Sequence, residues 1–242
     1  MDMINLEDIR LFKKNSVYRI GDLLLHSGAR WHIDRQEVIS NQKYKNTLLH
    51  KYFHHFKVDE HMWNLDMLSR SFQAANELST YDKKNTFSDF KFITDQHQIN
   101  TPKSDLLIHI RSGDIVSPKC KPYRKFCHLF NVDKLIDSIS KKIHSGIDRI
   151  VIISAMHYGA DSLRIGRYFW TQEKHDANLK LLNELFEKIS EIFRIPIAID
   201  SENCSDLEFI DNQFLKLIYS DNVILDYGGF SEIIHNLKSI DI

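Results

Sequence analysis

"LLIHIRSGDIV" (106–116) is an apolar run of strand length that ends at an arginine and is followed by a glycine and an aspartate. A continuous apolar run of this length, bounded by turn residues, is typical of a strand that is buried on both faces. The carboxyl end of this run nevertheless carries a cation, because Arg111 follows Ile110 directly. The stretch therefore predicts a buried strand whose exit places a guanidinium at the start of a turn.

The rest of the chain after residue 105 repeats this kind of strand in alternation with amphipathic helical stretches. The predicted strands are 106–110, 148–156, 195–201 and 222–228, and the predicted helices are 131–146, 178–193, 206–220 and a last helix from Ser231. Gly146 suits the residue that follows a helix C-terminus. Strands that alternate with helices predict right-handed crossovers and a parallel sheet with helices on both faces, which is an α/β fold.

The first hundred residues show no such alternation. Helical spacing of apolar residues predicts helices at "LEDIRLFKK" (6–14), "KNTLLHKYFHHF" (45–56) and "NLDMLSRSFQAANEL" (64–78), and "SVYRI" (16–20) and "EVISN" (37–41) are possible strands. Polar and turn residues are frequent in 79–105, which makes this stretch the best candidate for a domain border. We therefore predict a short, helix-rich N-terminal region over 1–104 and an α/β domain over 105–242.

The charge balance and the apolar pattern limit the class of protein. A formal net charge of -1 over 242 residues provides no long-range attraction for nucleic acid or acidic membranes. The N-terminal residues contain scattered charges, and no run of about 18 apolar residues occurs, so neither a signal peptide nor a transmembrane helix is predicted. Three cysteines leave an odd thiol under any disulfide pairing, which fits a reducing compartment. We expect a cytoplasmic protein that binds no nucleic acid.

The cysteines and histidines do not form a recognisable metal motif. Cys120 and Cys127 lie seven residues apart, without the short spacing that is typical of zinc sites. His50, His54 and His55 fall on a predicted helix, but the carboxylate of an HExxH motif is missing. We therefore predict no metal site.

The first candidate site is the strand end "HIRSGD" (109–114). Ligands of parallel α/β sheets bind outside the carboxyl ends of the strands. A guanidinium over a Ser-Gly turn is placed to make a forked, charge-assisted contact with a phosphate. The alternative is structural, because Arg111 can also cap a helix C-terminus or pair with Asp114.

The second candidate site is the strand end "DYGGFSEII" (226–234). Gly228 and Gly229, followed by Ser231 at the expected start of a helix, leave backbone N–H groups that favour an anion. A tight turn with a serine N-cap explains the same residues. Only eight glycines occur in the chain, and three of them mark these two strand ends.

Together these motifs resemble the fucosyltransferase superfamily, which includes the α1,2-, α1,6- and protein O-fucosyltransferases. "HIRSGD" is similar to the H-x-R-x-G-D signature of that superfamily, and "GGFS" (228–231) stands where the family commonly carries a Ser/Thr-x-Phe-Ser turn. Between them, "IVIISAM" (150–156), a long helix, "IAIDS" (197–201) and "DNQFLKLIYSDNVIL" (211–225) follow in the order of the family. The resemblance covers about 106–235.

The resemblance implies a Rossmann-like parallel sheet of GT-B type in the C-terminal part, with region 1–104 as the possible acceptor side. It implies an inverting glycosyltransferase that moves a sugar, fucose in the first place, from a GDP-sugar to a glycan or another hydroxyl acceptor. No metal or other cofactor takes part in the implied reaction. Arg111 would bind the β-phosphate of the donor, and Asp114 would lie close to the reacting centre or accept N–H bonds within its own turn.

The resemblance also implies the remaining donor-binding residues. His109, Ser112 and Gly113 belong to the first loop. Gly228, Gly229, Phe230 and Ser231 would approach the diphosphate from the second strand end. Asp211, with Asp206 as the second choice, would accept the N–H donors of a guanine edge.

Two features of the sequence leave the activity open. Many family members carry a second arginine where this chain has Ser112, so a non-catalytic nucleotide-sugar-binding module is the alternative function. The general base is also open among four carboxylates, which are Asp114, Glu232, Asp59 and Glu60.

Overall fold

The chain forms two compact units, and each unit is built from three separate segments of the chain. The computed structural model describes residues 5–13, 35–55, 87–143, 146–158 and 170–240. One unit, which we call the sheet unit, comprises Met1–Ser16, Asn100–Asn203 and Ser220–Tyr227. The other, the helical unit, comprises Val17–Ile99, Cys204–Tyr219 and Gly228–Ile242. The predicted domain border at residue 104 lies near one crossing between the units, and the chain crosses between them at other points as well.

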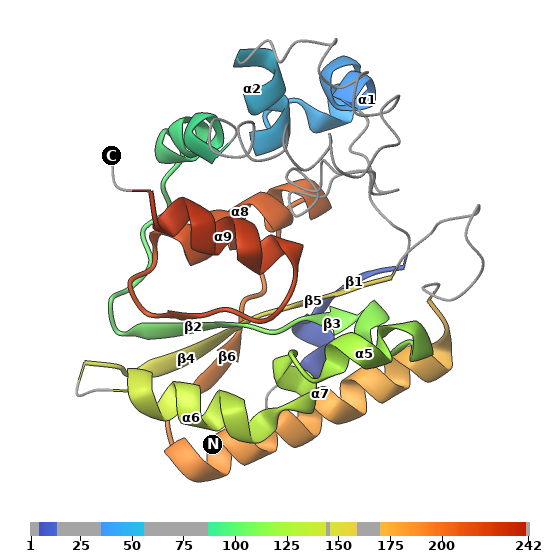
Figure 1. Ribbon diagram of the computed structural model, residues 1–242, viewed down its shortest axis with the longest axis vertical. Helices are drawn as coiled ribbons and strands as arrows, with labels where there is room; N and C mark the ends of the chain where they lie inside the picture. Colours follow the sequence, from blue (N-terminus) through green and yellow to red (C-terminus); the bar gives the residue numbers. More distant parts are fainter. Residues whose placement is uncertain (1–4, 14–34, 56–86, 144–145, 159–169, 241–242) are drawn as a thin grey trace, which may run out of the picture. The chain divides into compact units, whose positions relative to one another are not determined.

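Parallel strands form the centre of the sheet unit (Figure 1). The first sheet has the order β6 (Ile197–Ile199), β4 (Arg149–Ile153), β2 (Asp105–His109) and β7 (Val223–Ile224). The second has the order β1 (Arg10–Phe12), β5 (Ala155–His157) and β3 (Ser112–Gly113). The first sheet therefore runs third, second, first and fourth in chain order, as do the first four strands of a doubly wound sheet. The predicted α/β class is confirmed, and the sheet order is consistent with a Rossmann-like fold.

The two sheets follow one another along the chain, because β2 leads into β3 and β4 leads into β5. A short break in the strand pairing separates the two sheets. His109 lies opposite Ile153 and Ser112 lies opposite Met156, so the register is the same on both sides of the break. Buried hydroxyl groups bridge the break. Ser154 Oγ donates to the carbonyl of Ile110 at 2.8 Å, and Ser112 Oγ lies 3.0 Å from Ser154 Oγ. These bonds fix the course of the chain on both sides of Arg111.

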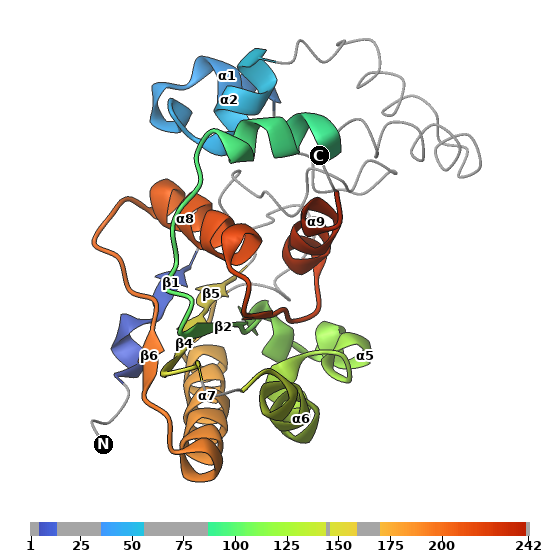
Figure 2. The same cartoon turned by 90° about the vertical axis from the view of Figure 1, so that its left-hand side faces the viewer.

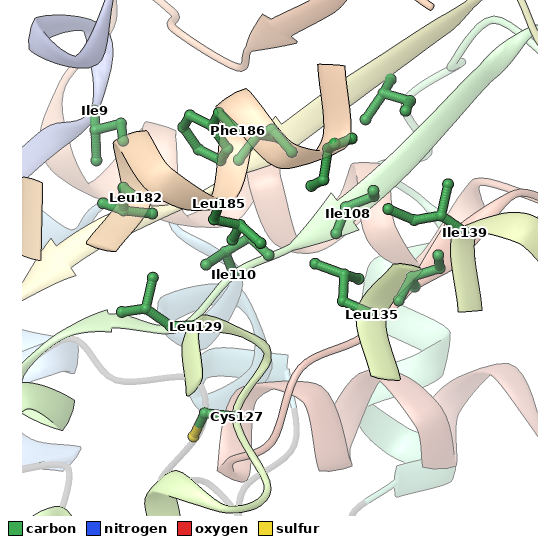
Figure 3. Close-up of a cluster of buried hydrophobic side chains, with 14 of the residues drawn as sticks. Ile9, Ile108, Ile110, Cys127, Leu129, Leu135, Ile139, Leu182, Leu185 and Phe186 are labelled. Atoms are coloured by element: carbon green, nitrogen blue, oxygen red, sulfur yellow. The ribbon is translucent and has the colours of Figure 1, made fainter. Parts of the chain in front are cut away.

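Helices α6 (Val132–Lys142) and α7 (Gln172–Phe193) cover one face of this sheet (Figure 2). Leu106, Ile108 and Ile110 alternate along the strand and point to that face, where they join a buried cluster (Figure 3). The helices contribute Leu135, Ile139, Leu182, Leu185 and Phe186 to the same cluster. Burial of each such side chain contributes about 1.5–3 kcal/mol, so the cluster fixes β2 and hence the position of its carboxyl end.

The helical unit is assembled from distant parts of the sequence. Its described helices are α1 (Arg35–Ser40), α2 (Leu48–His55), residues 87–95, α8 (Asp206–Tyr219) and α9 (Gly229–Lys238). Aromatic rings connect them: Phe90 lies 5.5 Å from Tyr52 and 5.8 Å from Phe214 between ring centroids. The Tyr219 hydroxyl donates to Asp95 at 2.5 Å. The helix of residues 45–56 is thus confirmed in its central part.

Several predictions for the N-terminal region are wrong. Residues 6–14 do not form one helix, because a 3-10 turn at Leu6–Asp8 is followed by β1. Residues 37–41 are not a strand, because they fall largely in α1. The polar stretch 79–105, for which no helix was predicted, contains the helix of residues 87–95; its prediction as a domain border is not contradicted, because a boundary between the units falls after Ile99. The stretches 16–20 and 64–78 lie outside the described residues.

Element ends also differ from the prediction in the α/β region. Helix α6 ends at Lys142, four residues before Gly146, and α7 begins six residues before the predicted start, with Thr171 as its N-cap. The Thr171 side chain accepts the N–H of Lys174 at 3.2 Å, which explains the earlier start. Within the part of the chain that the structure describes, no helix has the length and apolarity that a bilayer crossing requires.

Candidate functional site

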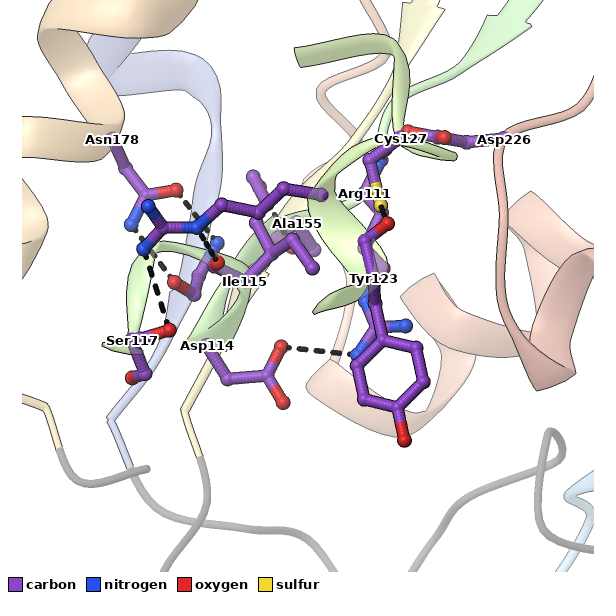
Figure 4. Close-up of polar contacts among 12 residues, drawn as sticks. Arg111, Asp114, Ile115, Ser117, Tyr123, Cys127, Ala155, Asn178 and Asp226 are labelled. Atoms are coloured by element: carbon purple, nitrogen blue, oxygen red, sulfur yellow. Dashed lines mark hydrogen bonds and ion pairs between the residues drawn. The ribbon is translucent and has the colours of Figure 1, made fainter. Parts of the chain in front are cut away.

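Arg111 lies just beyond the carboxyl end of β2 and contacts Asp114 and Asp226 (Figure 4). Its backbone N–H donates to Asp226 Oδ2 at 2.7 Å. Its Nη2 lies 3.4 Å from Asp114 Oδ1, which is long for a charge-assisted hydrogen bond, and 31% of the side chain is exposed. Burial disfavours the cation, but nearby acidic groups, Asp114 foremost, outweigh it and raise the pKa of Arg111. The guanidinium is therefore charged and open to a stronger anionic partner.

Asp226 is the residue of this site that the sequence analysis missed. Its carboxylate accepts three backbone N–H groups, from Arg111 at 2.7 Å, from His128 at 2.9 Å and from Tyr227 at 2.7 Å. Only 4% of the residue is exposed, and this burial raises its pKa, although His128 and the three N–H bonds act in the opposite direction. Asp226 follows β7, so it joins the carboxyl ends of β7 and β2.

Gly113 is held in place by an asparagine from α7. Its N–H donates to Asn178 Oδ1 at 2.9 Å, and its carbonyl accepts from Asn178 Nδ2 at 2.9 Å. Asn178 is fully buried and also lies 2.9 Å from the Tyr158 hydroxyl. Gly113 has a φ of 88°, in the region that favours glycine. This backbone turns β3 into the 3-10 helix Asp114–Val116.

Asp114 opens that short helix, and its carboxylate is turned towards Arg111. Its backbone carbonyl accepts the N–H of Ser117 at 2.9 Å, so the carbonyl makes the turn bond and the carboxylate contacts the guanidinium. Arg124 donates to the carbonyl groups of Ile115, Val116 and Ser117 and thereby holds the loop. The Asp114 side chain is 20% exposed, and a catalytic role for it stays a prediction.

Two other residues of the predicted site, Ser112 and His109, offer no positive charge to an anion. Ser112 is 3% exposed, and its hydroxyl donates to the carbonyl of Ala155 at 3.1 Å. For His109, burial foremost, followed by the effects of His128, Arg111 and His157, lowers the pKa to about 3. His109 is therefore neutral at pH 7 and can contact an anion only through a neutral hydrogen bond.

This pKa shift predicts the direction of an acid effect on stability. The ordinary pKa of 6.5 falls to about 3 on folding, so between these values the unfolded chain binds a proton that the folded chain does not. The free energy of unfolding is therefore expected to fall as the pH drops below 6.5. In His109→Gln, the urea midpoint is expected to change less between about pH 7 and about pH 5 than in the unaltered protein.

The control for this comparison is His235→Gln, which changes an exposed histidine of α9. That variant is expected to keep the pH dependence of the unaltered protein. An equal slope in the His109 and His235 variants would show that His109 does not cause the acid effect.

The two described cysteines of this region are packing residues. Cys120 and Cys127 are buried and free, and burial raises their pKa values to about 11 and about 12. Both thiols are therefore protonated at neutral pH and are poor nucleophiles. Among the residues that the structure describes, no group of three or more His, Cys, Asp or Glu side chains is arranged to hold a metal.

The second predicted strand end belongs to the helical unit from Gly228 onward. Helix α9 begins at Gly229 with Gly228 as its N-cap, at a φ of 136°. The prediction that Ser231 opens the helix is wrong, because Ser231 is its third residue and is 5% exposed. The Phe230 ring packs against Phe214, with 5.3 Å between the centroids.

Asp211 also lies in the helical unit, on α8. It is 7% exposed, and its Oδ2 accepts the N–H of Leu48 at 2.9 Å, which caps the first turn of α2. Asp206 is the first residue of α8. The structure thus brings 109–114 together in the sheet unit and places Asp211 and 228–231 in the helical unit, and a joint role of the two sets in binding a donor stays a prediction.

Two of the carboxylates considered as general base, Asp59 and Glu60, lie outside the described residues, and Glu232 lies in the first turn of α9. Asp114 is the one of the four within the sheet unit. Comparisons of the chain with protein-family models, with curated proteins and with solved structures found no match.

Proposed function

We propose that the sheet unit binds the diphosphate of a nucleotide sugar through Arg111. The observation that carries this proposal is the bridge between Arg111 and Asp226. In the strand order β6-β4-β2-β7, the chain order reverses between β2 and β7, and parallel sheets bind ligands at the carboxyl ends beside such a reversal. Arg111 and Asp226 follow these two strands and are joined by a 2.7 Å hydrogen bond. A charged guanidinium thus stands where ligands of such sheets bind.

We further propose that the protein is an inverting glycosyltransferase of the fucosyltransferase type, with a GT-B fold and a GDP-sugar donor. The acceptor hydroxyl attacks the anomeric carbon while the bond from that carbon to the β-phosphate oxygen breaks, so GDP leaves and the hydroxyl proton passes to a base. Arg111 stabilises the negative charge that develops on the leaving diphosphate. Asp114 is the candidate base in the sheet unit, because its carboxylate lies beside Arg111 and is partly exposed.

The second candidate function is a module that binds a nucleotide sugar without turnover. Ser112 favours it, because this position carries a buried hydroxyl bonded within the sheet where a second arginine would add charge. A single arginine stabilises a leaving diphosphate less than two do.

Ligand binding and turnover, measured separately, distinguish the two functions. We expect GDP to raise the melting temperature, because a ligand that binds only the folded state stabilises it by mass action. For an enzyme, GDP-fucose is hydrolysed slowly or its sugar is transferred to an acceptor, and Asp114→Asn lowers this turnover while GDP still binds. Binding without turnover on any acceptor of a broad panel would favour the module. The absence of a shift with GDP, UDP or their sugars would contradict both functions.

A further inference from the structure

Three aromatic side chains form an exposed cluster on the sheet unit. Tyr123, Phe126 and Tyr227 are 48%, 45% and 41% exposed. The ring centroids of Tyr123 and Tyr227 are 6.2 Å apart with 15° between the planes, and those of Phe126 and Tyr227 are 5.1 Å apart. Large aromatic rings are normally buried, and an exposed group of them marks an interaction surface. We call these three residues the aromatic cluster.

The aromatic cluster is tied to Arg111 by shared contacts. The Asp226 carboxylate accepts the backbone N–H of both Arg111 and Tyr227, each at 2.7 Å. On the other side, the Cys127 thiol donates to the carbonyl of Tyr123 at 3.6 Å, and the next residue, His128, donates its backbone N–H to Asp226 at 2.9 Å. Tyr123 lies on the helix α5 (Lys121–Arg124). Figure 4 draws Tyr123 in the same group of side chains as Arg111 and Asp114. The cluster therefore adjoins the proposed diphosphate site.

The charge around the cluster indicates the chemistry of its partner. Residues 120–128 contain three cations, Lys121, Arg124 and Lys125, and no acidic residue, although the whole chain has a net charge of -1. The Lys125 ammonium lies 4.9 Å over the Phe126 ring, and Tyr123 has the largest exposed fraction of the three rings. A neutral glycan gains little from such a concentration of positive charge. A nucleotide combines a flat ring, which stacks on an aromatic face, with phosphates that the cations attract.

We propose that the aromatic cluster stacks on the base of the nucleotide whose diphosphate Arg111 holds. This inference rests on the proposed function and names a subsite for it. Stacking uses the face of the base, which all bases share, so the cluster contributes affinity and does not choose between guanine and other bases. Choice of the base requires contacts to its edges. The substrate class that this surface fits is thus a nucleoside diphosphate, with the base on the cluster and the phosphates towards Arg111.

Calorimetry on the full chain with two ligands tests this subsite. GDP carries a base, and inorganic pyrophosphate supplies the phosphates alone. Tyr123→Ala and Tyr227→Ala are each expected to weaken GDP binding about tenfold and to leave pyrophosphate binding unchanged. Tyr227→Ala keeps the backbone N–H that Asp226 accepts, so Arg111 stays in place. Tyr123→Phe keeps the ring and is expected to bind GDP as the unaltered protein does.

Ile192→Ala is the matched control, because it removes an apolar side chain that is 48% exposed on α7. It is expected to leave the binding of both GDP and pyrophosphate unchanged. If the tyrosine variants weaken the binding of GDP and of pyrophosphate equally, the subsite is wrong. It is also wrong if they leave the affinity for GDP unchanged and raise the KM for a carbohydrate acceptor. If Arg111→Ala weakens GDP binding and the tyrosine variants do not, the subsite is wrong but the proposed role of Arg111 stands. If the unaltered protein binds neither ligand, the proposed function is wrong and the subsite fails with it.

Discussion

Arg111→Ala is expected to weaken the binding of GDP by about 30- to 150-fold, because a hydrogen bond between charged groups contributes about 2–3 kcal/mol. The fold is expected to remain intact. Asp226 accepts the backbone N–H of residue 111, which alanine retains, and the side-chain contact to Asp114 is long at 3.4 Å. Calorimetry with GDP gives the affinity, and thermal unfolding without ligand verifies that stability is unchanged.

Two control variants separate the geometry of the arginine from its charge. Arg111→Lys keeps the charge but cannot form a forked contact with a phosphate, so an intermediate affinity is expected. Lys180→Ala removes one positive charge from α7, where that side chain is 78% exposed, and is expected to leave GDP binding unchanged. GDP affinity that is the same in Arg111→Ala and the unaltered protein would remove Arg111 from the site. Equal losses in Arg111→Ala and Lys180→Ala would indicate a long-range effect of net charge.

The strands of the sheet unit were predictable because a buried strand has a local signal. The apolar run at 106–110 corresponds to β2, and 148–156 corresponds to β4 and β5 with a break at Ser154. The ends were less predictable, because they depend on the partner strand. The predicted strand 222–228 shortens to β7, which pairs only with Leu107 and Ile108. The pattern along one strand contains no information about how long its neighbour is.

Neither strand β1 nor the assignment of separate chain segments to the two units has a signal in the local sequence. Arg10–Phe12 pair with β5, and the Phe12 ring stacks on His157 at 4.5 Å between centroids. These contacts come from a distant part of the chain and override the helical spacing of 6–14. In the same way, α8 joins the helical unit through contacts such as the cap that Asp211 provides for α2. Helical periodicity shows that α8 exists but not which core it joins.

Of the two residues at the centre of the candidate site, Arg111 was predictable from the sequence and Asp226 was not. Arg111 was identified because a cation at the end of an apolar run is unusual within a single stretch of sequence. Asp226 was missed because one aspartate after a short strand is common. Its role arises from a hydrogen bond to Arg111 across 115 residues. The strand order that makes them neighbours appears only in the folded sheet.

Gly113→Ala is expected to destabilise the protein by about 2–5 kcal/mol, the largest stability effect of the changes considered. A Cβ on residue 113 would lie 2.5 Å from the backbone nitrogen of His157 and closer still to the carbonyl oxygen of that residue. Both are backbone atoms in the neighbouring strand β5, which cannot rotate away. The φ of 88° adds about 1–2 kcal/mol for any L-residue, and overpacking adds about 1–3 kcal/mol.

Such a loss corresponds to a fall in melting temperature of roughly 5–20 °C for a chain of this size. Gly229→Ala is the matched control. It adds the same methyl group at the first residue of α9, where φ is not positive, and alanine favours a helix, so its melting temperature is expected to equal or exceed that of the unaltered protein. An unchanged melting temperature in Gly113→Ala would mean that β3 and β5 do not approach as closely as the structure shows. In that case the loop that holds Arg111 and Asp114 would lack the rigid support that the proposed diphosphate binding requires.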